Sequence, residues 1–136
     1  MKIVAVAGMA PISKNPPASR QLYRDVLGLP LEAMDEYLGM NGFDGAKHFG
    51  VWPLHLAAQS CFGTPTWPAD VPEPTATIEF ELASPEAVQE AVEEMKARGQ
   101  QFVHESRMEP WGQTVARFMS PEGVLIGLSY APHFHA

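Results

Sequence analysis

The sequence predicts an α+β fold in which two tandem β-α-β-β-β modules form one cup-shaped mixed sheet. Three observations lead to this fold class: the order of elements repeats, a proline-rich segment divides the repeats, and each expected helix ends at a glycine, Gly28 or Gly99. We expect the first module over residues 1–60, the linker over residues 61–74 and the second module over residues 75–136. A module of this kind curls its sheet around a concave face, and two side by side make a cup that can hold a ligand.

The first half begins with a strand over residues 3–10, which alternate small and branched side chains. A helix is expected over residues 18–27, because one helical face carries Leu22, Tyr23, Val26 and Leu27. Three strands should follow over residues 31–38, 47–52 and 54–60, with turns at Asn41-Gly42 and Asp44-Gly45.

The second half begins with a strand over residues 75–82, where Thr77, Glu79 and Glu81 alternate with apolar residues. Ser84 followed by Pro85 is typical of a helix start, and this helix should run to Gly99. Three further strands are expected over residues 101–105, 113–119 and 124–130. The two halves therefore match element by element, which indicates an internal duplication.

Composition limits the classes of partner. With 46% hydrophobic and 18% charged residues, the chain can bury a core and is not of a disordered type. The formal net charge of −7 argues against nucleic acid and anionic membranes, and favours neutral or cationic small molecules. Cys61 is the single cysteine, so an internal disulfide is excluded and a reducing compartment is favoured. Without a recognisable membrane span or signal peptide, we expect a cytoplasmic protein.

Two motifs give the chain a family resemblance. Residues 22–29 read Leu-Tyr-Arg-Asp-Val-Leu-Gly-Leu, and residues 118–123 read Phe-Met-Ser-Pro-Glu-Gly. Together with the paired modules, they resemble the vicinal oxygen chelate superfamily, also called the glyoxalase/bleomycin resistance/dioxygenase group. Ser120 replaces the family's usual Asp, which would cap the turn. The resemblance implies a homodimer and a small organic ligand bound in the cup.

The resemblance also implies where a catalytic metal would sit. Family enzymes hold one divalent ion with His, Glu or Gln side chains from the first and last strands of each module. Here the expected first strand has no such residue, and the three other positions carry His55, Thr77 and Gly127. Because a divalent site needs about three protein ligands, we predict no metal, no cofactor and no catalytic residue.

The cup itself should bind the ligand. We expect His55, Thr77, Glu79 and Arg117 on its wall, with Gly127 leaving empty space that a ligand can fill. Trp67 and Trp111 should lie at the rim, where flat rings contact aromatic or cationic ligands. The resemblance to the bleomycin-resistance branch adds Gln113 beside Trp111. The predicted ligand-binding residues are therefore His55, Trp67, Thr77, Glu79, Trp111, Gln113, Arg117 and Gly127.

Other interpretations stay open. His55 can be a strand residue whose hydrogen bonds are satisfied by a neighbour. A structural ion-pair network can be formed by Glu79, Glu81 and Arg117. The tryptophans can belong to the core or to a dimer interface. A metal-dependent lyase, isomerase or dioxygenase could use His55 and a cup-facing glutamate. A structural domain would fill the cup with its own side chains. We treat His133 to His135 as a tail, and do not expect Cys61 to be a nucleophile.

Overall fold

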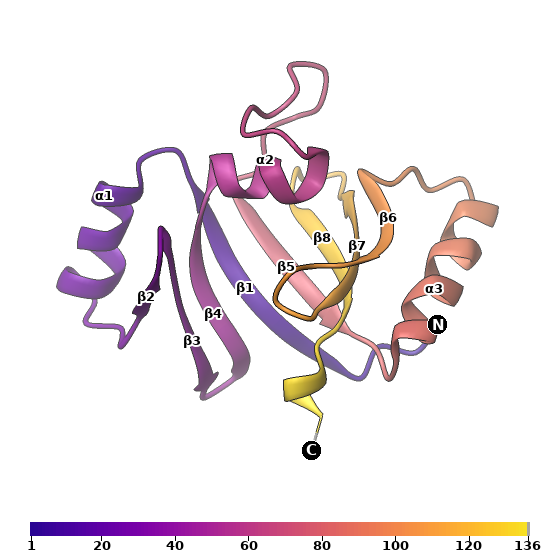
Figure 1. The fold of residues 1–136 in the computed structure, drawn as a ribbon, viewed down its shortest axis with the longest axis horizontal. Coiled ribbons are helices and arrows are strands. Elements are labelled where there is room, and N and C mark those ends of the chain that lie inside the picture. Colours follow the sequence, from indigo (N-terminus) through magenta and orange to yellow (C-terminus); the bar gives the residue numbers. More distant parts are fainter. Residues whose placement is uncertain (136) are drawn as a thin grey trace.

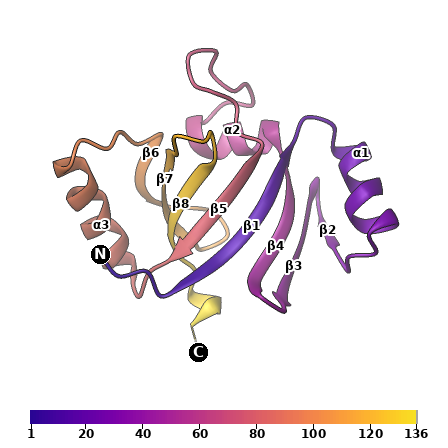
Figure 2. The same cartoon turned by 180° about the vertical axis from the view of Figure 1, so that it is seen from behind.

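The computed structural model describes residues 1–135, which form one curled eight-stranded sheet with helices around it (Figures 1 and 2). The strands are β1 (Ala5–Ser13), β2 (Glu32–Met34), β3 (Tyr37–Phe43), β4 (Ala46–Pro53), β5 (Ala76–Glu81), β6 (His104–Met108), β7 (Thr114–Met119) and β8 (Leu125–Tyr130). The helices are α1 (Pro16–Arg20), continued by the wider turns of η1 (Gln21–Val26), then α2 (Leu54–Phe62), α3 (Pro85–Ala97) and the short η2 (Pro132–Phe134).

The sheet reads as two equivalent halves. Its strand order is β2-β3-β4-β1-β5-β8-β7-β6, so each module places its first strand at the centre and its second strand at an edge. Strand β1 pairs with β4 in parallel, β5 pairs with β8 in parallel, and β1 joins β5 in antiparallel fashion. The expected α+β class and the curled sheet of tandem β-α-β-β-β order are confirmed, and the modules pair within one chain. Residue 136, the last of the expected second module, lies outside the described residues.

One expected strand is wrong. Residues 54–60 belong to α2, not to the last strand of the first module. Ala57, Ala58 and Cys61 recur at helical spacing and are buried, and Gly63 ends the helix in a left-handed conformation (φ 75°). A short apolar run does not distinguish strand from helix by periodicity alone.

The module still has four strands, because the expected strand over residues 31–38 is two strands. Asp35 has a φ of 55° and turns the chain between β2 and β3. The expected turn at Asn41-Gly42 lies inside β3, and Asp44-Gly45 makes the turn to β4. Strand β6 begins at His104, three residues later than the start predicted at Gln101.

Helix α2 covers one end of the concave face. Its buried residues pack with Ala10 of β1, Trp52 of β4 and Leu125 of β8 in one cluster. On the other face, α3 starts at Ser84, whose hydroxyl accepts a hydrogen bond from the Ala87 amide at 3.1 Å. Val88 and Val92 of α3 pack against the second module's sheet. The helices therefore leave the middle of the concave face uncovered.

Within residues 1–135, no helix combines the length and apolar character needed to cross a membrane.

Candidate functional site

A cleft of about 820 Å³ opens on the concave face. Leu56, Gln59 and Ser60 of α2 line one end, and His133 and Phe134 of η2 line the other. Figure 1 shows α2 and the C-terminal segment at opposite ends of the sheet. The loop between β6 and β7 adds the side wall that contains Trp111. His133 and Phe134, two of the three residues expected to form a tail, therefore form part of the cleft wall.

The C-terminal segment is tied to the sheet by a buried carboxylate. Glu81 Oε2 accepts hydrogen bonds from the Ala131 amide at 2.6 Å and from His135 Nε2 at 2.9 Å. The His135 ring also packs on Tyr130, with ring centroids 4.5 Å apart. These contacts hold His133 and Phe134 against the cleft.

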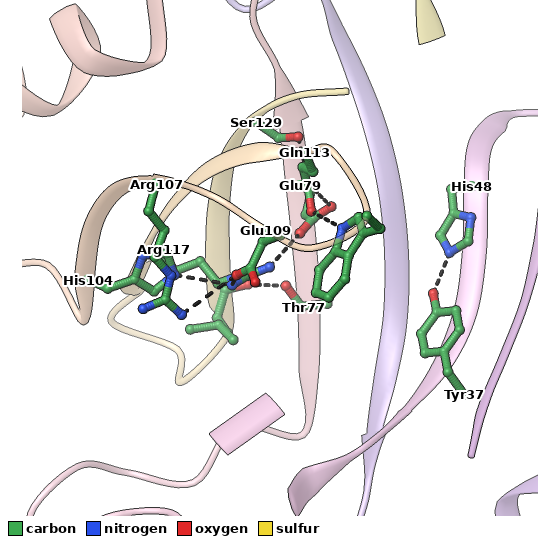
Figure 3. A network of polar contacts seen from close by, with 12 residues as sticks. Tyr37, His48, Thr77, Glu79, His104, Arg107, Glu109, Gln113, Arg117 and Ser129 are labelled. Carbon is green, nitrogen blue, oxygen red and sulfur yellow. Dashed lines mark hydrogen bonds and ion pairs between the residues drawn. The ribbon is translucent and has the colours of Figure 1, made fainter. Parts of the chain in front are cut away.

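Strand register places a row of residues across seven strands at one level. In strand order these are Asn41 (β3), His48 (β4), Gly8 (β1), Glu79 (β5), Gly127 (β8), Arg117 (β7) and His104 (β6). The two glycines, Gly8 and Gly127, interrupt the row of polar residues. Asn41 and His48 belong to a polar group in the first module, and Glu79, Arg117 and His104 belong to one in the second module. Figure 3 shows these groups on opposite sides of β1.

The group in the second module is centred on Arg117, which is 1% exposed. Its Nη1 donates to Glu109 Oε1 at 2.9 Å and to His104 Nε2 at 3.1 Å, and its Nη2 lies 3.7 Å from Glu79 Oε2 (Figure 3). The guanidinium also stacks 5.1 Å from the centroid of Trp52. Burial, with a smaller effect of the charge on Arg117, lowers the pKa of His104 to about 4. His104 is therefore neutral near pH 7, and Nε2 accepts the hydrogen bond from the arginine.

Gln113 connects this group to the rim of the cleft. Its side-chain amide donates to Glu79 Oε1 at 2.9 Å and to Ser129 Oγ at 2.8 Å. Its carbonyl accepts from Trp111 Nε1 at 2.8 Å. Trp111 is nevertheless 55% exposed, so its ring is fixed at one edge and open to the cleft.

The group in the first module is smaller. Tyr37 Oη is hydrogen-bonded to His48 Nε2 (Figure 3). On the other side of the ring, His48 Nδ1 is bonded to Asn41 Oδ1 at 2.7 Å. Since an amide oxygen only accepts, Nδ1 carries the proton of the neutral ring and Nε2 accepts from the tyrosine hydroxyl. Burial lowers the pKa of His48, partly opposed by the Glu79 charge, and burial with the Glu79 charge raises the pKa of Tyr37. Both groups are therefore neutral near pH 7.

Comparison with known proteins places the chain in a family. The model of the glyoxalase/bleomycin resistance protein/dioxygenase superfamily matches residues 9–128. The chain belongs to this superfamily. Among curated proteins, none is significantly similar in sequence.

Solved structures share the superfamily's fold with this chain. Methylmalonyl-CoA epimerase of Streptomyces coelicolor, in complex with 2-nitronate-propionyl-CoA, has 19% identity and a TM-score of 0.59, covering 96% of this chain and 99% of its own. A superfamily member from Vibrio splendidus has 16% identity and a TM-score of 0.57, with 95% and 98% covered. At these identities the likeness establishes the fold alone.

The superfamily's usual metal does not fit the residues of this cleft. Of the four central positions of the row, Gly8 and Gly127 offer no ligand, which leaves His48 and Glu79. Both nitrogens of His48 are hydrogen-bonded, and both oxygens of Glu79 face Gln113 or Arg117. Within residues 1–135, no three His, Cys, Asp or Glu residues are grouped so that they could hold a metal ion.

Five of the eight predicted binding residues line the cleft: Thr77, Glu79, Trp111, Gln113 and Arg117. His55 does not, because it lies on α2, where its Nε2 pairs with Glu36 Oε2 at 2.6 Å. Trp67 is buried rather than at the rim, packs against Phe62 and donates to the Val71 carbonyl at 3.0 Å. The space over Gly127 is not empty, because a Cβ there would meet Glu79 Cγ at 3.0 Å.

Sequence reasoning missed Tyr37, Asn41 and His48. The signal that could have found them is the pair of glycines inside the strands, Gly39 and Gly50, because a glycine in a strand interior often marks close approach of another group.

Proposed function

We propose that this chain binds a small organic molecule, neutral or cationic and with a flat ring, in the cleft of the concave face. The observation that carries the proposal is the cleft itself. Its size and its combination of apolar side chains with a few fixed polar groups are those of small-molecule sites. The membership of the chain in the glyoxalase/bleomycin resistance protein/dioxygenase superfamily also supports a role in binding small molecules.

Trp111 is the main contact proposed for the ring. Its indole is exposed on one face, while its N–H is held by Gln113. A ligand ring stacked on this indole would bury apolar surface without further ordering of the side chain. Met9 and Met34 also line the cleft and are exposed, so they add adaptable apolar contacts.

Charge supports a neutral or cationic ligand. Four acids line the cleft, Asp35, Glu36, Glu79 and Glu109, against two arginines, Arg107 and Arg117. Arg117 is already neutralised by Glu109. A cation would therefore be attracted by the carboxylates other than Glu109 and by the face of the Trp111 indole, while an anion would be repelled.

The proposed binding role needs no metal or other cofactor. This agrees with the central positions of the row, where His48 and Glu79 are the only side chains that could bind a metal and the other two positions are glycines. A cytoplasmic location, a homodimer and the absence of nucleic-acid partners also stay predictions.

Calorimetry with three compounds that share one ring tests this role: 1-naphthylmethylammonium, 1-naphthalenemethanol and 1-naphthoate. We expect the cation and the alcohol to bind more tightly than the carboxylate. Trp111→Ala should weaken binding about fivefold, since stacking contributes roughly 1 kcal/mol. Trp67→Phe, which alters a tryptophan outside the cleft, should leave affinity unchanged. Tightest binding by 1-naphthoate, or equal affinity in Trp111→Ala, would contradict the proposal.

A further inference from the structure

The Tyr37, His48 and Asn41 group has the connectivity of an acid–base chain. The tyrosine hydroxyl donates to the histidine, and the histidine donates to the amide oxygen of Asn41, which fixes its tautomer. The two rings are nearly parallel, with an interplanar angle of 8°. All three residues line the cleft, so the chain ends at the surface where a ligand would lie.

The strands are built to make room for this chain. Gly39 and Gly50 pair across β3 and β4, under the side chains of Tyr37 and His48. A Cβ on Gly39 would lie 2.6 Å from Tyr37 Cε1 and 3.0 Å from His48 Cε1, and a Cβ on Gly50 would overlap Tyr37 Oη. Neither glycine has a positive φ, so the missing side chain, and not the backbone conformation, is what the site requires.

Glycine in a strand interior destabilises a sheet relative to alanine, because it loses more conformational entropy on folding. A Cβ on Gly50 would also lie 2.8 Å from the Leu38 carbonyl oxygen, so the backbone accounts for part of the need for glycine there. The nearest atoms to a Cβ on Gly39 all belong to the side chains of Tyr37 and His48, so the loss of stability at Gly39 makes room for these two rings. Residues that lower the stability of the local structure are found preferentially at functional sites.

We propose that Tyr37 and His48, positioned by Asn41, are an acid–base pair that removes a proton from an organic ligand in the cleft. The inference rests on the binding role proposed above. The ligand's proton moves to Tyr37 Oη as the hydroxyl proton of Tyr37 moves to His48 Nε2. The electron pair of the broken bond stays on the ligand, and the imidazolium keeps its Nδ1 hydrogen bond to Asn41. The fitting substrate is a carbon acid in which that pair expels a leaving group or enters a conjugated system.

The charged groups around His48 suit this step. Glu79 on β5 shares its row and offsets the positive charge of the imidazolium, while His133 of the C-terminal segment opposes it. Tyr37 on β3 is the titratable group in direct contact. After the step, the proton returns to the ligand or passes to water, so no oxidant, reductant or co-reactant is needed.

Ring opening of 5-nitrobenzisoxazole tests the pair directly. This neutral, planar compound loses its C–H proton to a base, the electron pair forms a nitrile, and the N–O bond breaks to release a coloured nitrophenolate. We expect saturable turnover by the full chain, and a loss of about 100-fold in kcat in His48→Gln. The rate should rise with pH around a midpoint below the ordinary histidine pKa, because burial lowers the pKa of His48.

Tyr37→Phe keeps the ring over the two glycines but removes the hydroxyl. We expect kcat to fall at least about tenfold and the pH midpoint to move upward, because Nε2 loses the donor that favours its neutral form. Tyr23→Phe, a tyrosine outside the cleft lining, should change neither. His48→Gln at the wild-type rate, or no turnover by the wild-type chain, would overturn the pair. If the naphthyl compounds still bind in that case, the binding role survives, and if they do not, both proposals fail.

Discussion

The two polar groups of the cleft differ in how deeply they are buried, since Arg117, Glu109 and Gln113 are buried while Tyr37 and His48 are half-buried and Asn41 is exposed. In the second module, Arg117 is held by Glu109, His104 and Trp52, and Gln113 joins the same network. In the first module, three side chains form a single chain of hydrogen bonds over two glycines. A buried network with several shared partners specifies structure, while a short chain of hydrogen bonds open to a cleft is free to exchange a proton.

The internal symmetry of the sheet sharpens this difference. Strands β4 and β8 are equivalent, since each is the parallel neighbour of its module's first strand. At the shared level β4 presents His48 and β8 presents Gly127. Gly127 gives room to Glu79, which reaches across it toward Gln113 and Arg117. One module therefore uses this position for a functional group and the other uses it for space.

The largest expected effect comes from removing the arginine at the centre of the second-module network. Arg117→Met would leave Glu109 buried without its main partner, so we expect a loss of about 3–5 kcal/mol in the free energy of unfolding. Urea denaturation measures it. Arg107→Met, which removes a half-exposed arginine 3.6 Å from the same carboxylate, should cost less than about 1 kcal/mol. Equal losses in the two variants would show that the network is not centred on Arg117.

A smaller effect is expected from filling the space in the first module. Gly50→Ala would force Tyr37 off His48, at about 1–3 kcal/mol in the free energy of unfolding. In a Tyr37→Ala background the clash with the ring is gone and the close approach to the Leu38 carbonyl oxygen at 2.8 Å remains, so the same substitution should cost less. Urea denaturation of the four proteins gives the coupling energy. The same cost in both backgrounds would mean that Gly50 serves the backbone rather than the tyrosine.

The pH dependence of stability tests the burial of the two histidines, His104 and His48. Burial lowers the pKa of His104 to about 4 in the folded chain, against 6.5 when unfolded. Between these values the unfolded state binds more protons, so this contribution is complete above about pH 6.5 and is lost as the pH falls toward 4. His104→Gln should flatten that part of the stability curve, measured by denaturation at several pH values. His48→Gln should act in the same direction, and an unchanged slope in both variants would exclude this origin.

The sequence was sufficient for the duplicated order and for the face of β5. Period-2 alternation put Thr77, Glu79 and Glu81 on one side, and the network alternative for Glu79 and Arg117 agrees with their 3.7 Å separation. These inferences depend on local patterns, which the fold preserves.

The first-module group could not be predicted in the same way. The residues of α2 were taken for the last strand, so His55 was chosen where the structure has His48. Tyr37 was obscured because the turn at Asp35 shifts the register of the strand that follows. The contact between Tyr37 and His48 depends on the pairing of β3 with β4, and hence on tertiary structure that no local period encodes.

The smallest expected effect is that of added divalent metal ions, which should change neither the metal content nor the stability of the chain. The full chain, exposed to Ni, Zn, Mn and Fe(II) and then desalted, should retain no stoichiometric metal by elemental analysis, and its thermal midpoint should not change. The reason is the donor set, in which His48 and Glu79 face two glycines and are bonded to their own neighbours. The C-terminal segment should be kept for this measurement, because His133 and Phe134 are part of the cleft. About one metal per chain, lost in His48→Gln but kept in His135→Gln, would mean that the hydrogen bonds of His48 yield to a metal, and the two groups of the cleft would then share one function.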